Sequence, residues 1–395
     1  MVSNRQAFLN FLAPTSDSPM LLEIVSAKGV FMYGTDGKDY IDLISGVSVS
    51  YLGHSDPRII AAVKDQADKH LHLMVYGEFI QSPQIEYAKL LTSNLPESLQ
   101  SIYFLNSGAE AIEGAMKLAK RFTGKHEIAA FRNAYHGSTQ GALSIMGDEH
   151  FKNGFRPLLP GISLLRYNCL EDIEFITSKT ACVIIEILQA EAGIVEIDSE
   201  FLAALRNRCN LTGTLLVFDE IQTGFGRLGE VFGYGLYGVI PDILVLAKSL
   251  GGGMPLGAFI SSKEIMNSLS HDPVLGHITT FGGHPVSCAA GYAAFKVLIN
   301  ENLHLKADEK GNLFRKLLIH PAIKEIRGRG LLLAVELGNA DLMHKVVKKA
   351  IENGLVTDWF LFCDTAIRIS PALNITESEI EEACSRLTIA IEQAK

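Results

Sequence analysis

The sequence lacks several features that would assign it to a specialised class of protein. Its six cysteines are widely spaced in 395 residues and form no C-x-x-C pair, so neither a disulfide framework nor a cysteine-based metal site is expected. The formal net charge of −9 gives nucleic acid no electrostatic attraction. The N-terminus has neither a basic start nor a long apolar run, so we expect no secretory signal peptide.

Uninterrupted hydrophobic runs of membrane-spanning length are also missing. A long uncharged stretch that ends at Phe295 contains several glycines, two histidines and a proline, which makes it a poor membrane span. Cysteines such as Cys182 lie within apolar runs, as is typical of reduced core residues. We therefore expect a cytoplasmic protein that binds neither membrane nor nucleic acid and holds no metal ion.

The features that are present predict a large α/β protein. From about residue 100 to 260, short runs rich in β-branched residues alternate with amphipathic stretches, which indicates a mainly parallel sheet covered by helices. Residues 29–43 predict a hairpin around Asp36 and Gly37, and residues beyond about 300 predict a smaller α+β domain. We predict a large domain at 49–290, a small domain at 291–395, and an N-terminal segment 1–48 that packs with the small domain.

An acid and a lysine follow two of the apolar runs. Asp219 ends "LLVFD", and Lys248 ends "ILVLAK" just before three glycines. Ligands bind at the carboxyl ends of strands in open α/β sheets, so both side chains are expected at one site. Taken singly, Asp219 is equally well a helix N-cap and Lys248 an ordinary surface lysine. Together they match pyridoxal phosphate, which needs a lysine for its aldehyde and a carboxylate for its pyridinium nitrogen.

A phosphate-binding site should then accompany the acid and the lysine. "FLNSGAEAIEGAMKLAK" combines a strand end, Ser107-Gly108-Ala109 and a helix, whose free N–H groups suit a phosphate. The same residues also fit a plain turn before a capped helix. "FRNAYHGST" offers Tyr135 or His136 to stack on a flat ring, although such a pair also occurs in ordinary core packing.

The ordered set of motifs resembles the class III (subgroup II, fold type I) pyridoxal-phosphate aminotransferases, and the resemblance covers nearly the whole chain. It rests on "DGKDYIDLISGVSVSYLGHSDPRIIAAVKDQ", "NSGAEAIEGAMKLAKRFTGK", "YHGST", "IIEILQAEAG", "LLVFDEIQTGFGRLG", "PDILVLAKSLGGGMPLGAF", "TTFGGHPVSCAA", "IRGRGLLLAVEL" and "IRISPAL". The fold that this resemblance implies is a mainly parallel mixed sheet flanked by helices, with a smaller α+β domain.

The resemblance also implies a role for each site residue. Lys248 would bind the cofactor covalently, Asp219 would hold the pyridinium, and Thr280 would reach the phosphate of a neighbouring subunit, which implies a homodimer with active sites at the interface. The cofactor-binding residues that it implies are Ser107, Gly108, Ala109, Tyr135, His136, Glu186, Asp219, Ile221, Gln222, Lys248 and Thr280. The substrate-binding residues that it implies are Glu191, Arg368 and Val47.

Departures from the family pattern concern the substrate. In the family an arginine such as Arg368 binds the carboxylate of a keto acid, and a glutamate such as Glu191 neutralises it when that carboxylate is absent. Members acting on acetylornithine, ornithine or 4-aminobutyrate often have an arginine directly after the His-Gly pair, where this chain has Ser138. Ile187, Ala192 and Ala372 also depart from common family residues.

We therefore expect a ping-pong aminotransferase whose donor is an ω- or β-amino acid or an amine, and whose acceptor is 2-oxoglutarate or pyruvate. An acetylornithine- or 4-aminobutyrate-type enzyme is the alternative donor class. An aminomutase of the glutamate-1-semialdehyde type is a second alternative, which would need no separate acceptor. A non-catalytic binding protein is disfavoured, because Lys248 and Asp219 are both present.

Overall fold

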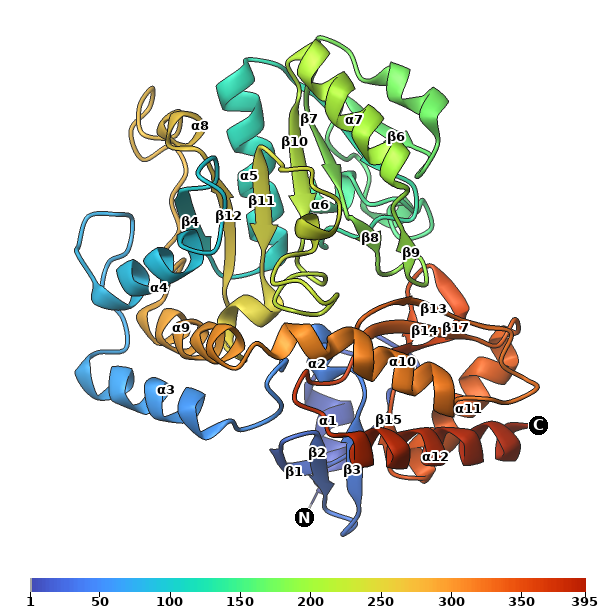
Figure 1. Ribbon diagram of the computed structural model, residues 1–395. Coiled ribbons are helices and arrows are strands. Elements are labelled where there is room, and N and C mark those ends of the chain that lie inside the picture. The colour runs from blue at the N-terminus through green and yellow to red at the C-terminus, as the bar shows by residue number, and fades with distance from the viewer. Residues whose placement is uncertain (1) are drawn as a thin grey trace.

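The computed structural model describes residues 2–395, and its largest element is a seven-stranded sheet (Figure 1). The strand order is β4 (Ser101–Leu105), β12 (Gly257–Ser261), β11 (Ile243–Leu246), β10 (Leu215–Asp219), β7 (Thr180–Ile185), β5 (Glu127–Phe131) and β6 (Ile162–Leu165). Only β12 runs antiparallel to its neighbours. The connection from β11 to β12 is too short for a crossover, so β12 has to return in the opposite direction. The prediction of a mainly parallel α/β sheet is confirmed.

Helices cover both faces of this sheet, because its buried strands send alternate side chains to opposite faces. Val217 of β10 packs in the same core cluster as Ala115 of α5 (Gly108–Thr123). Its neighbour Phe218 packs in the cluster that contains Leu205 of α7 (Ser199–Thr212). Smaller elements around the sheet are α6 (Gln140–Ser144), α8 (Lys263–Asn267), β8 (Leu188–Gln189) and β9 (Val195–Glu196).

A second sheet lies toward the C-terminus, in the red part of Figure 1. It is antiparallel, in the order β13 (Glu325–Arg329), β14 (Leu332–Glu336), β17 (Cys363–Ile369) and β16 (Trp359–Phe360). The helices around it are α10 (Ala307–Leu317), α11 (Ala340–Glu352) and α12 (Glu377–Ala394), the last begun by a capping box of Thr376 and Glu379. The predicted α+β character of this region is confirmed.

Three further helices pack against one another. The longest, α9 (Pro285–Asn300), packs against α3 (Pro57–Lys69) and α4 (Ser82–Thr92). In Figure 1 it extends from the large sheet toward the red, C-terminal part of the molecule. Among residues 2–395, no helix has the length and apolar character that a bilayer crossing requires.

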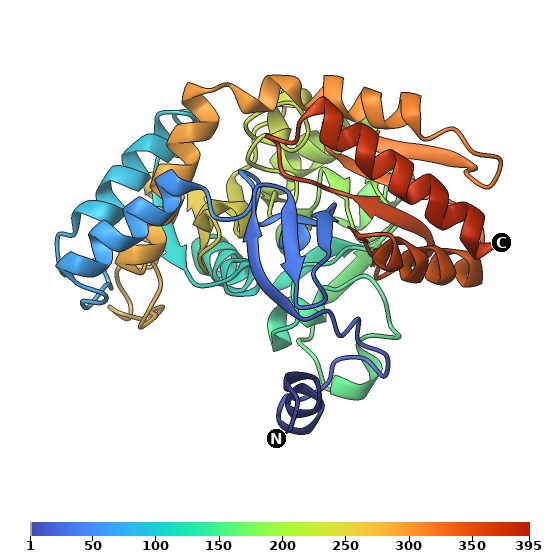
Figure 2. The same ribbon diagram turned by 90° about the horizontal axis from the view of Figure 1, so that it is seen from below.

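The N-terminal strands complete the architecture. β1 (Ile24–Lys28), β2 (Phe31–Gly34) and β3 (Asp39–Asp42) form antiparallel pairs, which confirms the predicted hairpin. β3 also pairs in parallel with β15 (Leu355–Val356), so the N-terminal segment joins the C-terminal region. The helix α1 (Asn4–Phe11) buries none of its residues and stands away from the main body (Figure 2). The domain boundaries at 48 and 290 stay a prediction.

Candidate active site

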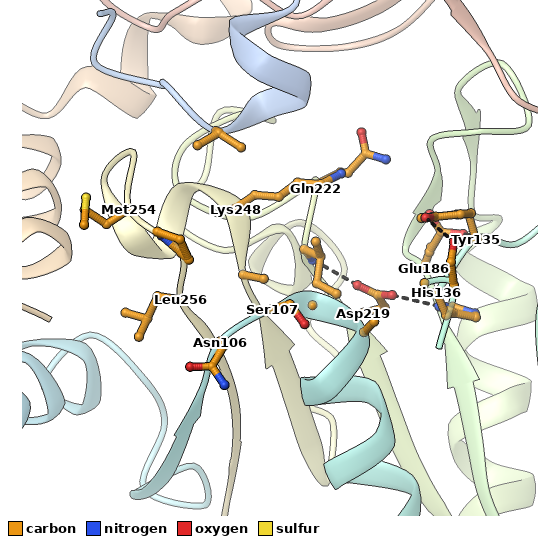
Figure 3. A pocket seen from close by; sticks show the side chains of 18 of the residues that line it. Asn106, Ser107, Tyr135, His136, Glu186, Asp219, Gln222, Lys248, Met254 and Leu256 are labelled. Carbon is orange, nitrogen blue, oxygen red and sulfur yellow. Dashed lines mark hydrogen bonds and ion pairs between the residues drawn. The ribbon is translucent and has the colours of Figure 1, made fainter. Parts of the chain in front are cut away.

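A cavity of about 460 Å³ opens beyond the carboxyl ends of several strands of the large sheet (Figure 3). Its size falls within the range of small-molecule sites, and its position is where open α/β sheets bind ligands. It is lined by Val49, Asn106, Ser107, Gly108, Ala109, Tyr135, His136, Gly137, Ser138, Glu186, Asp219, Ile221, Gln222, Ala247, Lys248, Gly253, Met254, Pro255 and Leu256. These residues come mainly from the loops that follow β4, β5, β7, β10 and β11.

One wall of the cavity is the N-terminus of α5. Ser107 caps this helix by accepting a hydrogen bond from the Glu110 N–H at 3.2 Å. The N–H groups of Gly108 and Ala109 lie in the first turn, where no partner exists within the helix. A Cβ on Gly257 would lie 2.2 Å from the Ser107 carbonyl oxygen, so only glycine leaves this turn undisturbed. The arrangement suits a phosphate group.

Asp219 ends β10 and is fixed on both of its oxygens. Its Oδ2 lies 2.7 Å from His136 Nδ1, and its Oδ1 accepts a hydrogen bond from the Ile221 N–H at 3.0 Å. Both ionisable side chains are buried. Within the described residues, His136 Nε2 is also buried and has no hydrogen-bond partner. A buried carboxylate held in this way provides a fixed negative charge at the cavity wall.

Lys248 follows β11 after one residue, Ala247, and has a left-handed backbone, with φ of +50°. Such a conformation is unfavourable for a residue with a side chain and is found most often at functional sites. Burial lowers the pKa of Lys248 to about 8, although the carboxylates of Glu191, Asp219 and Glu186 act in the opposite direction. A lysine with this pKa carries a substantial neutral, nucleophilic fraction near neutral pH.

Glu186 is a further carboxyl group in the cavity wall. Its Oε2 accepts a hydrogen bond from the Tyr135 N–H at 3.2 Å, and its Oε1 accepts one from the Ala190 N–H at 3.4 Å. Burial raises the pKa of Glu186 well above its usual range, and the charge of Asp219 reinforces the shift. Glu186 therefore favours the neutral form.

Arg368 of β17 lies beyond Gln222, outside the wall of the cavity, and only 2% of it is exposed. Its Nη1 and Nη2 donate to the two carboxylate oxygens of Glu191 at 2.9 and 3.0 Å. Gln222 Nε2 donates to Glu191 at 2.9 Å, so the pair adjoins the cavity. Burial alone would raise the pKa of Glu191, but Arg368 outweighs it and lowers that pKa to about 2.

The cavity brings together all the predicted cofactor-binding residues except Thr280. Thr280 is exposed, and its neighbour Thr279 accepts a hydrogen bond from Asn106 Nδ2 at 3.2 Å. Val47 does not line the cavity, whereas Val49 does. Val47 lies in α2 (Ser45–Ser48), where residues 45–48 all have positive φ, so the side-chain alternation of a regular strand does not apply.

Sequence reasoning missed several residues of this region. Asn106 precedes the predicted Ser107 turn, and its position beside the cavity follows from that of Ser107. Met254 and Leu256 reach the cavity only because the preceding glycines turn the chain back, and no sequence signal marked them. Ser138, noted as a departure from the family pattern, lines the cavity with its hydroxyl oxygen 3.2 Å from that of Tyr135.

The cavity residues fit pyridoxal phosphate, since the helix N-terminus suits the phosphate, Asp219 the pyridinium and Lys248 the aldehyde. The family "Aminotransferase class-III" matches residues 12–391. An acetylornithine aminotransferase of Methanopyrus kandleri is 38% identical over 93% of this chain and 94% of its own length.

Solved structures show the same relationship. An ornithine aminotransferase of Toxoplasma gondii, with pyridoxal phosphate at partial occupancy in its active site, has a TM-score of 0.91 at 30% identity, covering 98% of this chain and 93% of its own. A thermostable omega transaminase mutant of Pseudomonas jessenii has a TM-score of 0.92 at 26% identity, covering 100% and 99%. The chain belongs to the class III aminotransferases, pyridoxal-phosphate-dependent enzymes with the type I fold.

Proposed function

We propose that this aminotransferase takes an amino group from an ω- or β-amino acid or an amine and passes it to 2-oxoglutarate or pyruvate in two alternating half-reactions. The observation that carries the proposal is the Arg368–Glu191 pair beside a cavity with few positive charges. Within residues 2–395, Lys248 is the only lysine or arginine in the cavity wall. A single guanidinium then serves a single substrate carboxylate.

Pyridoxal phosphate, when bound, supplies an aldehyde that captures amines and a protonated ring that accepts electrons. In our proposal, Lys248 would hold the cofactor covalently through Nζ. When free, the neutral Nζ would be the base that accepts the proton from the carbon that carries the amino group. Asp219 keeps the ring nitrogen protonated.

The remaining cavity residues bind and orient the cofactor in this proposal. Ser107, Gly108 and Ala109 hold the phosphate, and Thr280 of a second subunit completes that site. Tyr135 and Ile221 line the cavity and would pack against the two faces of the ring. Three polar residues complete the set: Gln222 contacts the phenolic oxygen, His136 fixes the carboxylate of Asp219, and Glu186 lies beside that carboxylate.

Arg368 and Glu191 adapt the site to two different substrates. In the half-reaction with the keto acid, Arg368 binds the α-carboxylate through the bidentate geometry that a guanidinium favours. In the half-reaction with a donor that lacks this carboxylate, Glu191 occupies the same edge, as it does in the structure. The buried arginine is therefore neutralised in both half-reactions.

The choice of donor rests on Ser138. A second carboxylate at the far end of a donor would find the hydroxyl groups of Ser138 and Tyr135 at this place in the wall. A buried carboxylate without a charged partner costs a few kcal/mol, enough to reduce turnover by tens to thousands of times. An acetylornithine-type activity, which the Methanopyrus kandleri relative supports, or a 4-aminobutyrate-type activity is the second candidate. An aminomutase of the glutamate-1-semialdehyde type is the third.

A panel of amines and amino acids, each paired with 2-oxoglutarate or pyruvate, tests this proposal. We expect turnover of ω- or β-amino acids or amines to exceed that of N-acetylornithine by at least about tenfold. Efficient use of N-acetylornithine would contradict the assigned donor class. Product formation without any added keto acid would instead identify an aminomutase.

We further propose a homodimer with active sites at the interface. Large apolar side chains are exposed in two segments, which we together call the apolar patch. The first segment contributes Leu71, Leu73, Met74, Phe79 and Ile80, and the second contributes Val274, Leu275, Ile278 and Phe281. The rings of His72 and Phe281 are 4.9 Å apart, so the two segments lie side by side. An exposed patch of this kind is typical of an interface. Thr279 lies between two residues of the patch and accepts a hydrogen bond from Asn106 of the cavity wall, so the patch adjoins the cavity.

We also propose a cytoplasmic location. All six cysteines are free thiols, and four of them are buried. Burial raises the pKa of the Cys182 thiol to about 12, so it is an unreactive core residue. A reduced state of this kind is usual in the cytoplasm.

A further inference from the structure

The guanidinium of Arg368 has partners on two different edges. Its Nη1 and Nη2 donate to Glu191, while its Nε donates to Asp358 Oδ1 at 2.9 Å. Asp358 is largely buried, with 21% of its side chain exposed. Asp358 was not among the site residues expected from the sequence, and it does not line the cavity.

The Nε edge is held within the sheet that carries Arg368. Asp358 directly precedes β16, which pairs with β17, the strand that carries Arg368. The Arg368 N–H also donates to the Asp358 carbonyl oxygen at 2.9 Å. Asp358 is thus attached to the same sheet as the arginine, so the two keep their relative position when other parts move.

Two neighbours of Asp358 contact the same guanidinium. The Trp359 carbonyl oxygen accepts a hydrogen bond from Nη2 at 3.1 Å. The centroid of the Phe360 ring lies 4.6 Å from the guanidinium carbon, which is within cation–π distance. Three consecutive residues, 358–360, therefore form a seat for Arg368.

Glu191 and Gln222 contact Arg368 from the other side. Glu191 lies in the turn between β8 and β9, and Gln222 lies in the loop after β10. Both contact Arg368 through their side chains alone, and Glu191 Oε2 also accepts a hydrogen bond from the Leu361 N–H at 3.0 Å. Glu191 occupies the Nη1 and Nη2 edge bidentately, which is the edge that a substrate carboxylate needs. A carboxylate can replace Glu191 there without disturbing the contact between Nε and Asp358.

We propose, on the basis of the proposed function, that Asp358 is a positioning residue that holds Arg368 through Nε in both half-reactions and so presents the Nη1 and Nη2 edge to the keto-acid carboxylate. While Glu191 and the substrate exchange, Arg368 lacks a carboxylate partner at Nη1 and Nη2. The acceptor at Nε stays in place during that exchange and keeps the guanidinium from rotating away.

Three variants of the full-length holoenzyme test this role. Asp358→Ala removes the acceptor, Asp358→Ser replaces it with a hydroxyl too short to reach Nε, and Asp358→Asn keeps an oxygen acceptor without the charge. The half-reactions with 2-oxoglutarate and with a carboxylate-free amine are followed separately from the cofactor's absorbance. Binding of glutarate, an unreactive dicarboxylate, is measured in the same way.

We expect Asp358→Ala and Asp358→Ser to raise the KM for 2-oxoglutarate and the Kd for glutarate by about tenfold or more. The rate at saturating 2-oxoglutarate and the amine half-reaction should change by no more than about twofold. Asp358→Asn should restore glutarate binding to the unaltered level or tighter, because it keeps the Nε contact and removes a negative charge near the ligand. If Asp358→Ala does not fold, the same binding and kinetic measurements on Asp358→Ser test the prediction.

Arg368→Ala separates the two proposals. If Arg368→Ala impairs both half-reactions equally, the proposed function of Arg368 fails. If Arg368→Ala is selective but the Ala and Ser variants of Asp358 leave glutarate binding unchanged, the role of Asp358 is wrong. Equal losses of both half-reactions in the Asp358 variants would also overturn it. Adding Asp358→Ala to Arg368→Ala should weaken glutarate binding no further, because the two residues act as one unit.

Discussion

The imidazole Nδ1 of His136 lies 2.7 Å from Oδ2 of Asp219, and both side chains are buried. The Ile221 N–H occupies the other oxygen of Asp219, so the carboxylate cannot rotate without breaking one of these bonds. Such a fixed anion is what a protonated pyridine nitrogen requires, because its charge is already in position and needs no reorganisation. The pair therefore identifies the part of the cavity where the cofactor ring is expected.

Replacing Asp219 with asparagine should separate cofactor binding from turnover. The amide has nearly the same shape but no charge to keep the ring nitrogen protonated, so cofactor should still bind while turnover falls by orders of magnitude, each tenfold being about 1.4 kcal/mol. Cofactor absorbance and steady-state rates measure the two effects. Asp68→Asn, at an exposed position of α3, is the matched control. Near-normal turnover of Asp219→Asn would count against its role.

The pKa of Lys248 predicts how the cofactor-free enzyme responds to pH. Burial disfavours the ammonium form and lowers the pKa of Lys248 to about 8, so the amine is mostly neutral above that pH. The rate of covalent cofactor capture should rise between pH 7 and about 9 and then level off. A solvated lysine, with a pKa of about 10.4, would show a rise that continues to higher pH.

Stopped-flow absorbance provides that profile, and borohydride reduction followed by peptide mapping locates the modified lysine. We expect the adduct on Lys248, and Lys248→Ala should form none. A rate that still climbs at pH 10, or an adduct confined to another lysine, would contradict the prediction.

Gly257→Ala should displace the backbone of Ser107, which belongs to the proposed phosphate site. The new Cβ would lie 2.2 Å from the Ser107 carbonyl oxygen, so the backbone at the start of α5 would have to move. Strain of this kind typically costs about 1–3 kcal/mol, and we expect a lower Tm together with cofactor affinity weakened by about tenfold. Gly154→Ala is the control, because a Cβ there meets nothing within 4 Å. If both variants bind cofactor like the unaltered enzyme, the tight turn at Ser107 has no part in phosphate binding.

The apolar patch predicts a homodimer interface, which a charged side chain placed in the patch should disrupt. Ile80 is 93% exposed in the patch, and Ile80→Asp should shift the enzyme toward monomers with strongly reduced activity, measured by sedimentation and steady-state rates. Leu211→Asp is the control, because Leu211 is 83% exposed on α7, outside the patch. A fully active monomer, whether of the variant or of the unaltered chain, would contradict the predicted use of Thr280 from a second subunit.

The positions of Asp219 and Lys248 were accessible from the sequence because each directly follows an apolar run that had to be a buried strand. Once those strands are parallel neighbours, as β10 and β11 are, their carboxyl ends and the residues that follow them meet at one edge. The Ser107 turn follows β4 in the same way. These side chains are positioned by local chain geometry, which a sequence records.

The seat of Arg368 could not be predicted in this way. Asp358 reaches Nε only because β16 pairs with β17, and β16 has just two residues, too few for a periodic signal. Val49 lines the cavity whereas Val47 does not, and residues 45–48 all have positive φ, so no regular periodicity predicts which of their side chains face the cavity. Tertiary pairing and backbone strain decide such positions, and residue patterns do not encode either of them directly.

The pairing of β3 with β15 has a consequence for the order of events during synthesis. Strand β3 ends at Asp42, and its partner begins at Leu355, so a ribosome adds about 300 residues in between, which takes on the order of tens of seconds. Throughout that time one edge of β3 has no partner and is exposed to aggregation. The hydrogen bond from the Ser370 N–H to the Leu43 carbonyl oxygen likewise forms only after residue 370 has been synthesised. The segment that carries Val49 to the cavity is therefore anchored only when the chain is nearly complete, so a truncated nascent chain has no finished active site.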